Sequence, residues 1–248
     1  MSLASRNLHR INHAKTAFFV CDIQDRFSTE IFSYPTLITT AQKLLSAAQV
    51  LDSRVIVTEQ YPKVLGSTDK KLDISRAVIN QPKTLFSMVS PEVQTHLEGI
   101  ESIILFGLEV LLSILFSSKI VSSQIFSLFK IKNHWLYTSF FILIPRKTFY
   151  QSHVCILQTC LDLLRHGFDV RVVVDGVSSA NKTEIPTALM RMSAAGAILS
   201  TSDSILFELM ADSKNPKFKE ISAIVKAHLV STKANPLGLG SGFLTSQL

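Results

Sequence analysis

Short runs of almost uninterrupted apolar residues recur along this chain and constrain its fold more than any other feature. The clearest runs are TAFFVCDIQDRF (16–27), SRVIVTEQYP (53–62), ESIILFGL (101–108) and DVRVVVDGVSS (169–179), followed by the shorter AILST (197–201). Apolar runs without polar alternation are typical of strands that are buried on both faces, as in a parallel sheet. We therefore expect the sheet to form the middle of the molecule.

Segments with apolar residues at helical spacing alternate with these runs. They are 35–52, 91–100, 153–167, 183–196 and 216–229. This alternation predicts an α/β fold, with a parallel sheet covered by helices on both faces and ligands bound beyond the carboxyl ends of the strands. We expect a single domain over residues 14–230 and a flexible Gly/Ser-rich tail over 231–248.

Residues 110–151 differ from the rest of the chain. The segment contains the only Trp, six of the 16 Phe, no Gly and no acidic residue, and its apolar residues follow neither a helical nor a strand period. Three interpretations stay open. They are a real insertion packed on the domain, a membrane span over 110–131, and a translated intron. A lysine near its middle disfavours the span. The first and last residues favour the intron, because valine codons begin with GT and glutamine can be encoded by CAG.

The charge distribution argues against a nucleic-acid partner. The net charge is +6, but residues 110–151 supply most of it through five lysines and arginines. No arginine-rich helix, zinc-ligand spacing or RNP-like aromatic strand accompanies the charge. No Gly-rich phosphate loop follows a strand either. We therefore expect no nucleic acid, no cofactor and no membrane partner.

The three cysteines, Cys21, Cys155 and Cys160, are odd in number and lie in apolar runs without a preceding signal peptide. This pattern favours a reducing intracellular compartment. We expect the cytoplasm, with a mitochondrial or peroxisomal location as the alternative, because the start is basic and the chain ends in SQL.

Three residues are candidates for chemistry. Cys155 opens a predicted helix, where free N–H groups and the helix dipole favour a thiolate and can hold an oxyanion. Asp22 follows the first predicted strand, and Lys83 stands between Pro82 and an apolar stretch. The simpler alternatives are a core cysteine, a helix-capping carboxylate and a solvated loop lysine. Cys160 lies about 140° around the helix from Cys155 and is expected to face the core.

The ordered set FFVCDIQDRF, VTEQYPKVLGST, KTLFSM, IILFGLE joined to SHVCILQTCLDLL, and VVVDGVSSA followed by SAAGAILSTSDSILFEL resembles the isochorismatase-like cysteine hydrolase superfamily. The resemblance is greatest to its eukaryotic isochorismatase domain-containing members and covers 14–229 apart from 110–151. It implies a three-layer α/β/α fold and a homo-oligomer.

The resemblance also implies a catalytic triad of Asp22, Lys83 and Cys155 that acts on a small amide- or carbonyl-containing substrate. The turn that forms the oxyanion site would involve Glu109, Ser152 and Val154. The nicotinamidase branch of the superfamily binds a metal through histidines that VTEQYP lacks, so no metal is expected.

The position of residues 110–151 leaves a second function open. The segment enters between Glu109 and Ser152, inside the expected oxyanion turn, and a displacement of about 1 Å can cost on the order of 100-fold in rate. The alternative to a cysteine hydrolase is therefore a catalytically impaired binding or scaffold protein that keeps the fold.

Overall fold

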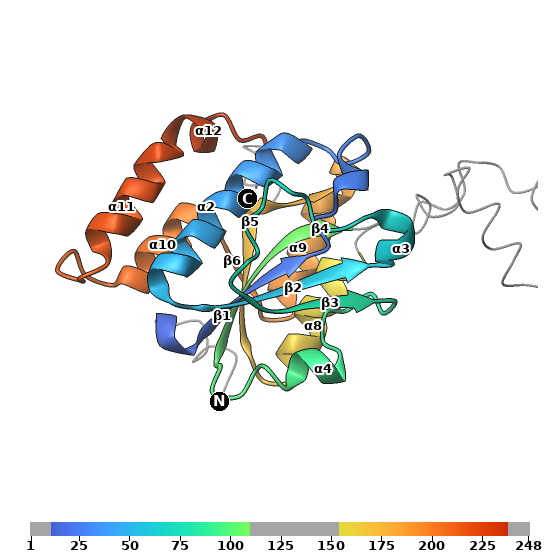
Figure 1. The fold of residues 1–248 in the computed structure, drawn as a ribbon, viewed down its shortest axis with the longest axis horizontal. Coiled ribbons are helices and arrows are strands. Elements are labelled where there is room, and N and C mark those ends of the chain that lie inside the picture. Colours follow the sequence, from blue (N-terminus) through green and yellow to red (C-terminus); the bar gives the residue numbers. More distant parts are fainter. Residues whose placement is uncertain (1–10, 110–153, 238–248) are drawn as a thin grey trace, which may run out of the picture.

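A computed structural model describes residues 11–109 and 154–237 and shows a six-stranded parallel sheet between two layers of helices (Figure 1). The strands, in chain order, are β1 (Thr16–Cys21), β2 (Arg54–Gln60), β3 (Ala77–Lys83), β4 (Ser102–Glu109), β5 (Asp169–Ser179) and β6 (Ile198–Ser200). Their order across the sheet is β3-β2-β1-β4-β5-β6. The order reverses between β1 and β4, which is the point where open parallel sheets bind ligands.

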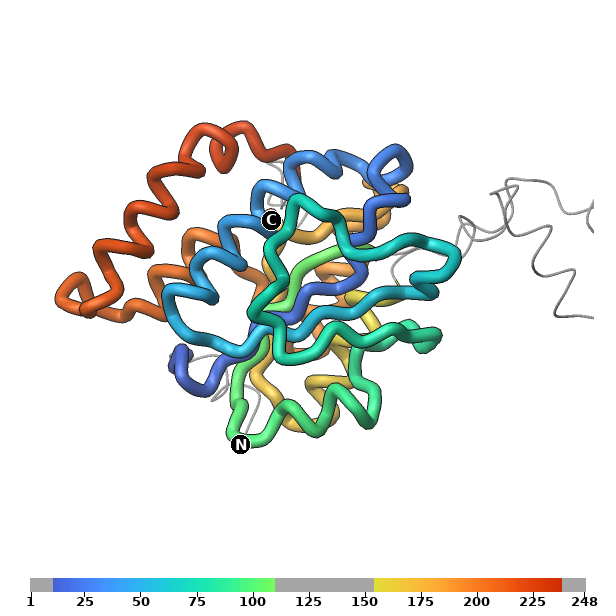
Figure 2. The backbone as a smooth tube through the Cα atoms, in the orientation of Figure 1, coloured from blue at the N-terminus to red at the C-terminus, as the bar shows by residue number. Residues whose placement is uncertain are grey.

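Most of the longer helices follow the predicted segments, whereas residues 202–210 were not predicted as a helix and the segment 91–100 is helical only at Pro91–Gln94. The longer helices are α2 (Tyr34–Leu51), α8 (Cys155–Arg165), α9 (Ile185–Ala194), α10 (Ser202–Met210) and α11 (Phe218–Ala227), with the short α3 (Pro62–Leu65), α4 (Pro91–Gln94) and α12 (Leu229–Lys233). Helices α2, α10 and α11 pack together on one face of the sheet, and α8 and α9 cover the other. The tube in Figure 2 follows the same path. The predicted α/β/α architecture is confirmed.

Strand β3 is the element that the apolar pattern did not identify. Its sequence AVINQPK alternates half-buried and exposed residues, because it is an edge strand with a single neighbour, β2. Pro82 is tolerated there, since an edge strand has one side without a hydrogen-bonded partner. The strand matters for function because its last residue is Lys83.

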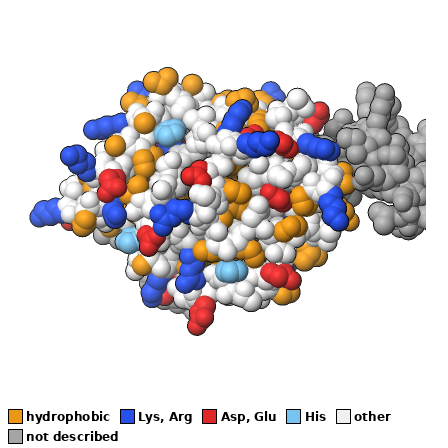
Figure 3. Space-filling view, viewed as in Figure 1, with side chains coloured by type: hydrophobic (Ala, Val, Ile, Leu, Met, Phe, Trp, Pro, Cys, Tyr) orange, Lys and Arg blue, Asp and Glu red, His pale blue; other side chains and the backbone are white. Residues whose placement is uncertain are grey.

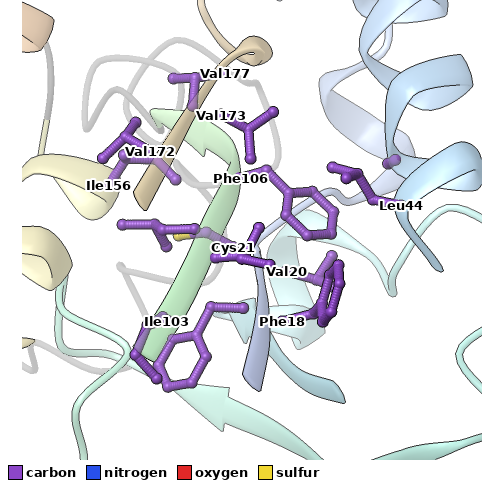
Figure 4. Packing of buried hydrophobic residues seen from close by; sticks show 14 of the residues in the cluster. Phe18, Val20, Cys21, Leu44, Ile103, Phe106, Ile156, Val172, Val173 and Val177 are labelled. Atoms are coloured by element: carbon purple, nitrogen blue, oxygen red, sulfur yellow. The ribbon is translucent and has the colours of Figure 1, made fainter. Parts of the chain in front are cut away.

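The core lies on both sides of the sheet. In Figure 4, Phe18, Val20 and Phe106 lie on the side of Leu44 in helix α2, and Cys21 lies on the opposite side, toward Ile156 of α8. All six residues of β1 are buried, as a central strand requires. Cys21 is thus a core residue at the carboxyl end of the central strand.

Gly107 allows strand β4 to approach the end of β1. Its φ is +134°, and a Cβ atom at this position would lie 2.2 Å from the carbonyl oxygen of Cys21. Cys21 and Gly107 are register partners in the sheet. Any side chain at residue 107 would therefore push the ends of the two central strands apart.

Residues 110–151, for which three interpretations stay open, lie outside the described residues. Among helices in the two described ranges, none has both the length and the apolarity that a bilayer crossing requires. Helix α12 reaches Lys233 and Leu237 is buried, so ordered packing continues past the domain boundary expected at residue 230. The extent of the tail stays a prediction.

Candidate active site

Asp22 lies directly after β1, at the carboxyl end of the sheet, and its side chain is completely buried. Its backbone is in the left-handed region, with φ 52°. This conformation is uncommon for residues other than glycine, although aspartate tolerates it better than most. The hydroxyl of Thr58 in β2 donates to Asp22 Oδ1 at 2.7 Å. The carboxylate is therefore held by the neighbouring strand and caps no helix.

Lys83 places its ammonium group beside this carboxylate. Lys83 Nζ donates to Asp22 Oδ2 at 2.7 Å and to Gln60 Oε1 at 2.7 Å, and further to the carbonyl oxygens of Leu85 and Phe86. The residue is only 6% exposed, which excludes the alternative of a solvated loop lysine. The local sequence could not show this, because burial of the lysine depends on the pairing of β3 with β2.

The environment keeps Lys83 charged. Burial lowers the pKa of Lys83, but the charge of Asp22, together with its hydrogen bond to Lys83, offsets burial and raises the pKa above its usual value. Removing two charges from water is costly, and a buried ion pair is a poor way to gain stability. The pair is therefore a candidate for a chemical role.

Cys155 is the first residue of α8 and is completely buried. Cys21 Sγ lies 3.6 Å from Asp22 Oδ2 as a donor. Burial, the neighbouring thiol of Cys155 and the charge of Asp22 raise the pKa of Cys21 well above its usual value. Cys21 therefore stays a thiol beside the candidate base.

The turn residues fall into two groups. Glu109 and Val154 are described, and Ser152 lies outside the described residues. Glu109 Oε1 accepts the backbone N–H of Leu157 at 2.7 Å, so the end of β4 contacts the first turn of α8. Val154 precedes the helix and is its N-cap residue.

Two residues of the site, Thr58 and Gln60, were not among the candidates from the sequence. Both belong to VTEQYP at the carboxyl end of β2 and are buried. Gln60 is itself fixed, because its backbone N–H donates to Gln24 Oε1 at 2.8 Å. Their position at a strand end was the available signal, since neighbouring parallel strands place such residues along one edge.

The arrangement combines a carboxylate, an ammonium group and two thiols without contact to bulk water. A thiol at a helix N-terminus beside a carboxylate suits nucleophilic catalysis at a carbonyl carbon. Within 11–109 and 154–237, no group of three or more His, Cys, Asp or Glu residues could hold a metal ion.

Comparison with protein-family models matches the "Isochorismatase domain" to residues 150–204. Isochorismatase domain-containing protein 1 of Salmo salar is 39% identical over 217 residues, which cover 86% of this chain and 62% of that protein. The chain also covers only 64% of the protein of the same name from Danio rerio. It thus spans less than two thirds of both relatives.

Other relatives are covered almost completely. Isochorismatase domain-containing protein 2A of Mus musculus is 32% identical over 249 residues, which cover 99% of this chain and 100% of that protein. Among solved structures, the MAR1 ribonuclease of Caenorhabditis elegans is similar with a TM-score of 0.68 and 35% identity, over 88% of this chain and 93% of that one. The chain belongs to the isochorismatase domain family.

Proposed function

We propose that the protein is a cysteine hydrolase in which Cys155, Asp22 and Lys83 cleave a small amide- or carbonyl-containing substrate. The observation that carries the proposal is the buried 2.7 Å ion pair between Asp22 and Lys83 beside the thiol of Cys21, with Cys155 buried at the start of α8. The substrate would approach at the carboxyl ends of the strands. No metal or cofactor takes part in this scheme.

The reaction would proceed through a thioester. Asp22 accepts the proton of the Cys155 thiol, and the sulfur forms a bond to the carbonyl carbon of the substrate. The tetrahedral intermediate collapses with loss of the amine, which takes the proton from Asp22. Water then attacks the thioester while Asp22 accepts its proton, and the acid and the free thiol are released. Lys83 would stabilise the negative charge of Asp22 and of the sulfur.

The oxyanion would be held by backbone N–H groups at the start of α8, among them that of Cys155. Such groups lie at the positive end of the helix dipole, and a single oxyanion donor can contribute about 3 kcal/mol.

Thiol labelling tests the nucleophile directly. Iodoacetamide should modify Cys155 faster than Cys21 and Cys160, as measured by mass spectrometry of peptides from the full-length protein. With p-nitrophenyl acetate we expect a burst of nitrophenolate that Cys155→Ala abolishes and the matched control Cys160→Ala retains. Equal labelling of the three cysteines, or an undiminished burst in Cys155→Ala, would contradict the proposal.

The substrate class can be tested in the same preparation. The relative from C. elegans is named a ribonuclease, so RNA belongs in the substrate panel. Acidic and basic side chains lie interspersed on the face seen in Figure 3, which favours a small substrate over a polyanion. If the Cys155→Ala variant still cleaves RNA as fast as wild type, the result would favour a nuclease that uses another active site.

We expect the chain to act as a homo-oligomer. Tyr61 and Leu85, which follow the paired carboxyl ends of β2 and β3, are large apolar side chains that are 46% and 57% exposed. Exposed apolar side chains of this kind are typical of contact surfaces. Sedimentation equilibrium should give a mass above 27.5 kDa, and a monomer mass would contradict this expectation.

A further inference from the structure

Glu109 is a buried acidic residue that the proposed reaction does not use. It is the last residue of β4, and its side chain is completely buried. Oε1 accepts the N–H of Leu157 at 2.7 Å. Leu157 is the third residue of α8, so its N–H is one of those that the helix itself leaves without a partner.

The carboxyl group lies at the first turn of the helix. Burial raises the pKa of Glu109 to about 8, and the backbone N–H groups of residues 154–157 oppose that rise. These four groups surround the start of α8, where Cys155 is the first residue. The side chain of Glu109 thus joins the end of β4 to the start of α8. Cys155, the first residue of α8, lies 46 positions after Glu109 in the sequence.

We propose that Glu109 is a positioning residue, whose carboxyl group holds the first turn of helix α8, and with it Cys155, against the end of strand β4. The inference rests on the proposed function in one respect, the role of Cys155 as nucleophile. A contact between β4 and α8 fixes the helix start without depending on the length of chain between them. The contact would therefore keep the helix start in place even when residues are inserted after Glu109.

The hydrogen bond from the Leu157 N–H requires an acceptor oxygen on residue 109 but no negative charge. Among the residues that the structure describes, none bonds Oε2 of Glu109, and a neutral carboxyl avoids leaving a charged oxygen unsatisfied in the interior. The titratable side chain beside it is Cys160 of α8, whose pKa is raised to about 12 by burial and then by the charge of Glu109. On β5, the register partner of Glu109 is Ser179, which does not titrate.

Two substitutions at Glu109 test the contact. Glu109→Gln keeps an Oε1 acceptor of the same reach, and Glu109→Ala removes it. Glu101→Ala is the matched control, because Glu101 directly precedes the same strand and its side chain is 65% exposed. All variants are made in the full-length protein.

The experiment has two readouts. Hydrogen exchange of the Leu157 amide reports the contact, and the ratio of iodoacetamide labelling at Cys155 to that at Cys160 reports where the nucleophile stands. In Glu109→Ala we expect faster exchange and a labelling ratio reduced by about 10-fold or more. Glu109→Gln should stay within about 3-fold of wild type in both readouts, and Glu101→Ala should match wild type.

The outcomes separate this inference from the proposed function. Unchanged exchange and labelling in a folded Glu109→Ala would overturn the positioning role. If Glu109→Ala does not fold, Glu109→Gln provides the test. Loss of Leu157 amide protection in a folded Glu109→Gln variant would also overturn the positioning role. If the three cysteines of the wild type label equally, the hydrolase proposal fails, whereas the Leu157 exchange still tests the contact.

Discussion

At the scale of single residues, the site depends on a few fully buried polar side chains whose partners come from other elements. Asp22 accepts hydrogen bonds from Thr58 and Lys83, and Lys83 also donates a hydrogen bond to Gln60. Each buried polar group must find such partners, because an unpaired one costs about 1–3 kcal/mol. A network of this kind fixes the orientation of the carboxylate that is proposed as the base.

The raised pKa of Glu109 predicts a pH dependence of stability. The ordinary value is 4.5 and the folded value is about 8, so between them the folded state binds more protons than the unfolded state. The free energy of unfolding should therefore fall as the pH rises from 4.5 to about 8, by at most about 1.4 kcal/mol per pH unit. Below 4.5 this contribution is complete.

Glu109→Gln removes this titration. We expect the stability of wild type relative to Glu109→Gln to decrease between about pH 5 and about pH 8, as measured from urea unfolding midpoints. Glu101→Gln, at the exposed residue that precedes the same strand, serves as the control and should show no such trend. A constant difference between wild type and Glu109→Gln across this range would contradict the raised pKa.

At the scale of elements, the close approach of β1 and β4 forms the floor of the site. Gly107 lies against the backbone of Cys21, where an added Cβ would be 2.2 Å from the oxygen and 2.8 Å from the nitrogen. The helices on the other face are tied by Lys43 of α2, which is buried and bonds Asp203 of α10 and Thr232 of α12. The sheet positions the candidate active-site residues, and the hydrogen bonds of Lys43 join the helices that cover its other face.

Gly107→Ala should destabilise the protein by about 2 kcal/mol or more, because backbone atoms of Cys21 must move and the positive φ is strained. Gly99→Ala is the matched control. Its φ is +75° but no atom lies within 4 Å of the added Cβ, so we expect a loss of about 1 kcal/mol. Urea unfolding measures both losses. Equal losses would show that strain alone, and not the contact with Cys21, restricts residue 107.

At the scale of the whole molecule, the described residues on the two sides of the unusual segment lie close together. Glu109 contacts the N–H of Leu157, so Ser152, His153 and Val154 would suffice as the loop from β4 to α8 if 110–151 were absent. Loops of two to six residues are common between a strand and the following helix. This proximity favours the interpretation of 110–151 as a translated intron, which remains a proposal.

Sequencing of mature transcripts tests that proposal. We expect reads in which the codon of Ser152 directly follows the codon of Glu109. Reads that continue from Glu109 into Val110 in most transcripts would contradict it and favour a genuine insertion. In either case the contact between Glu109 and Leu157 predicts that the start of α8 keeps its place at the end of β4.

The apolar runs and helical periods by themselves determined the α/β class, the parallel sheet and the bounds of most elements, because burial on both faces imposes a pattern that local sequence carries. They placed Asp22 and Cys155 at element ends for the same reason. The tertiary structure alone decided the edge strand β3, the burial of Lys83, and the roles of Thr58, Gln60 and Glu109 as partners. Those features arise from contacts between residues distant in the chain, and no periodicity within a single segment encodes which strands become neighbours.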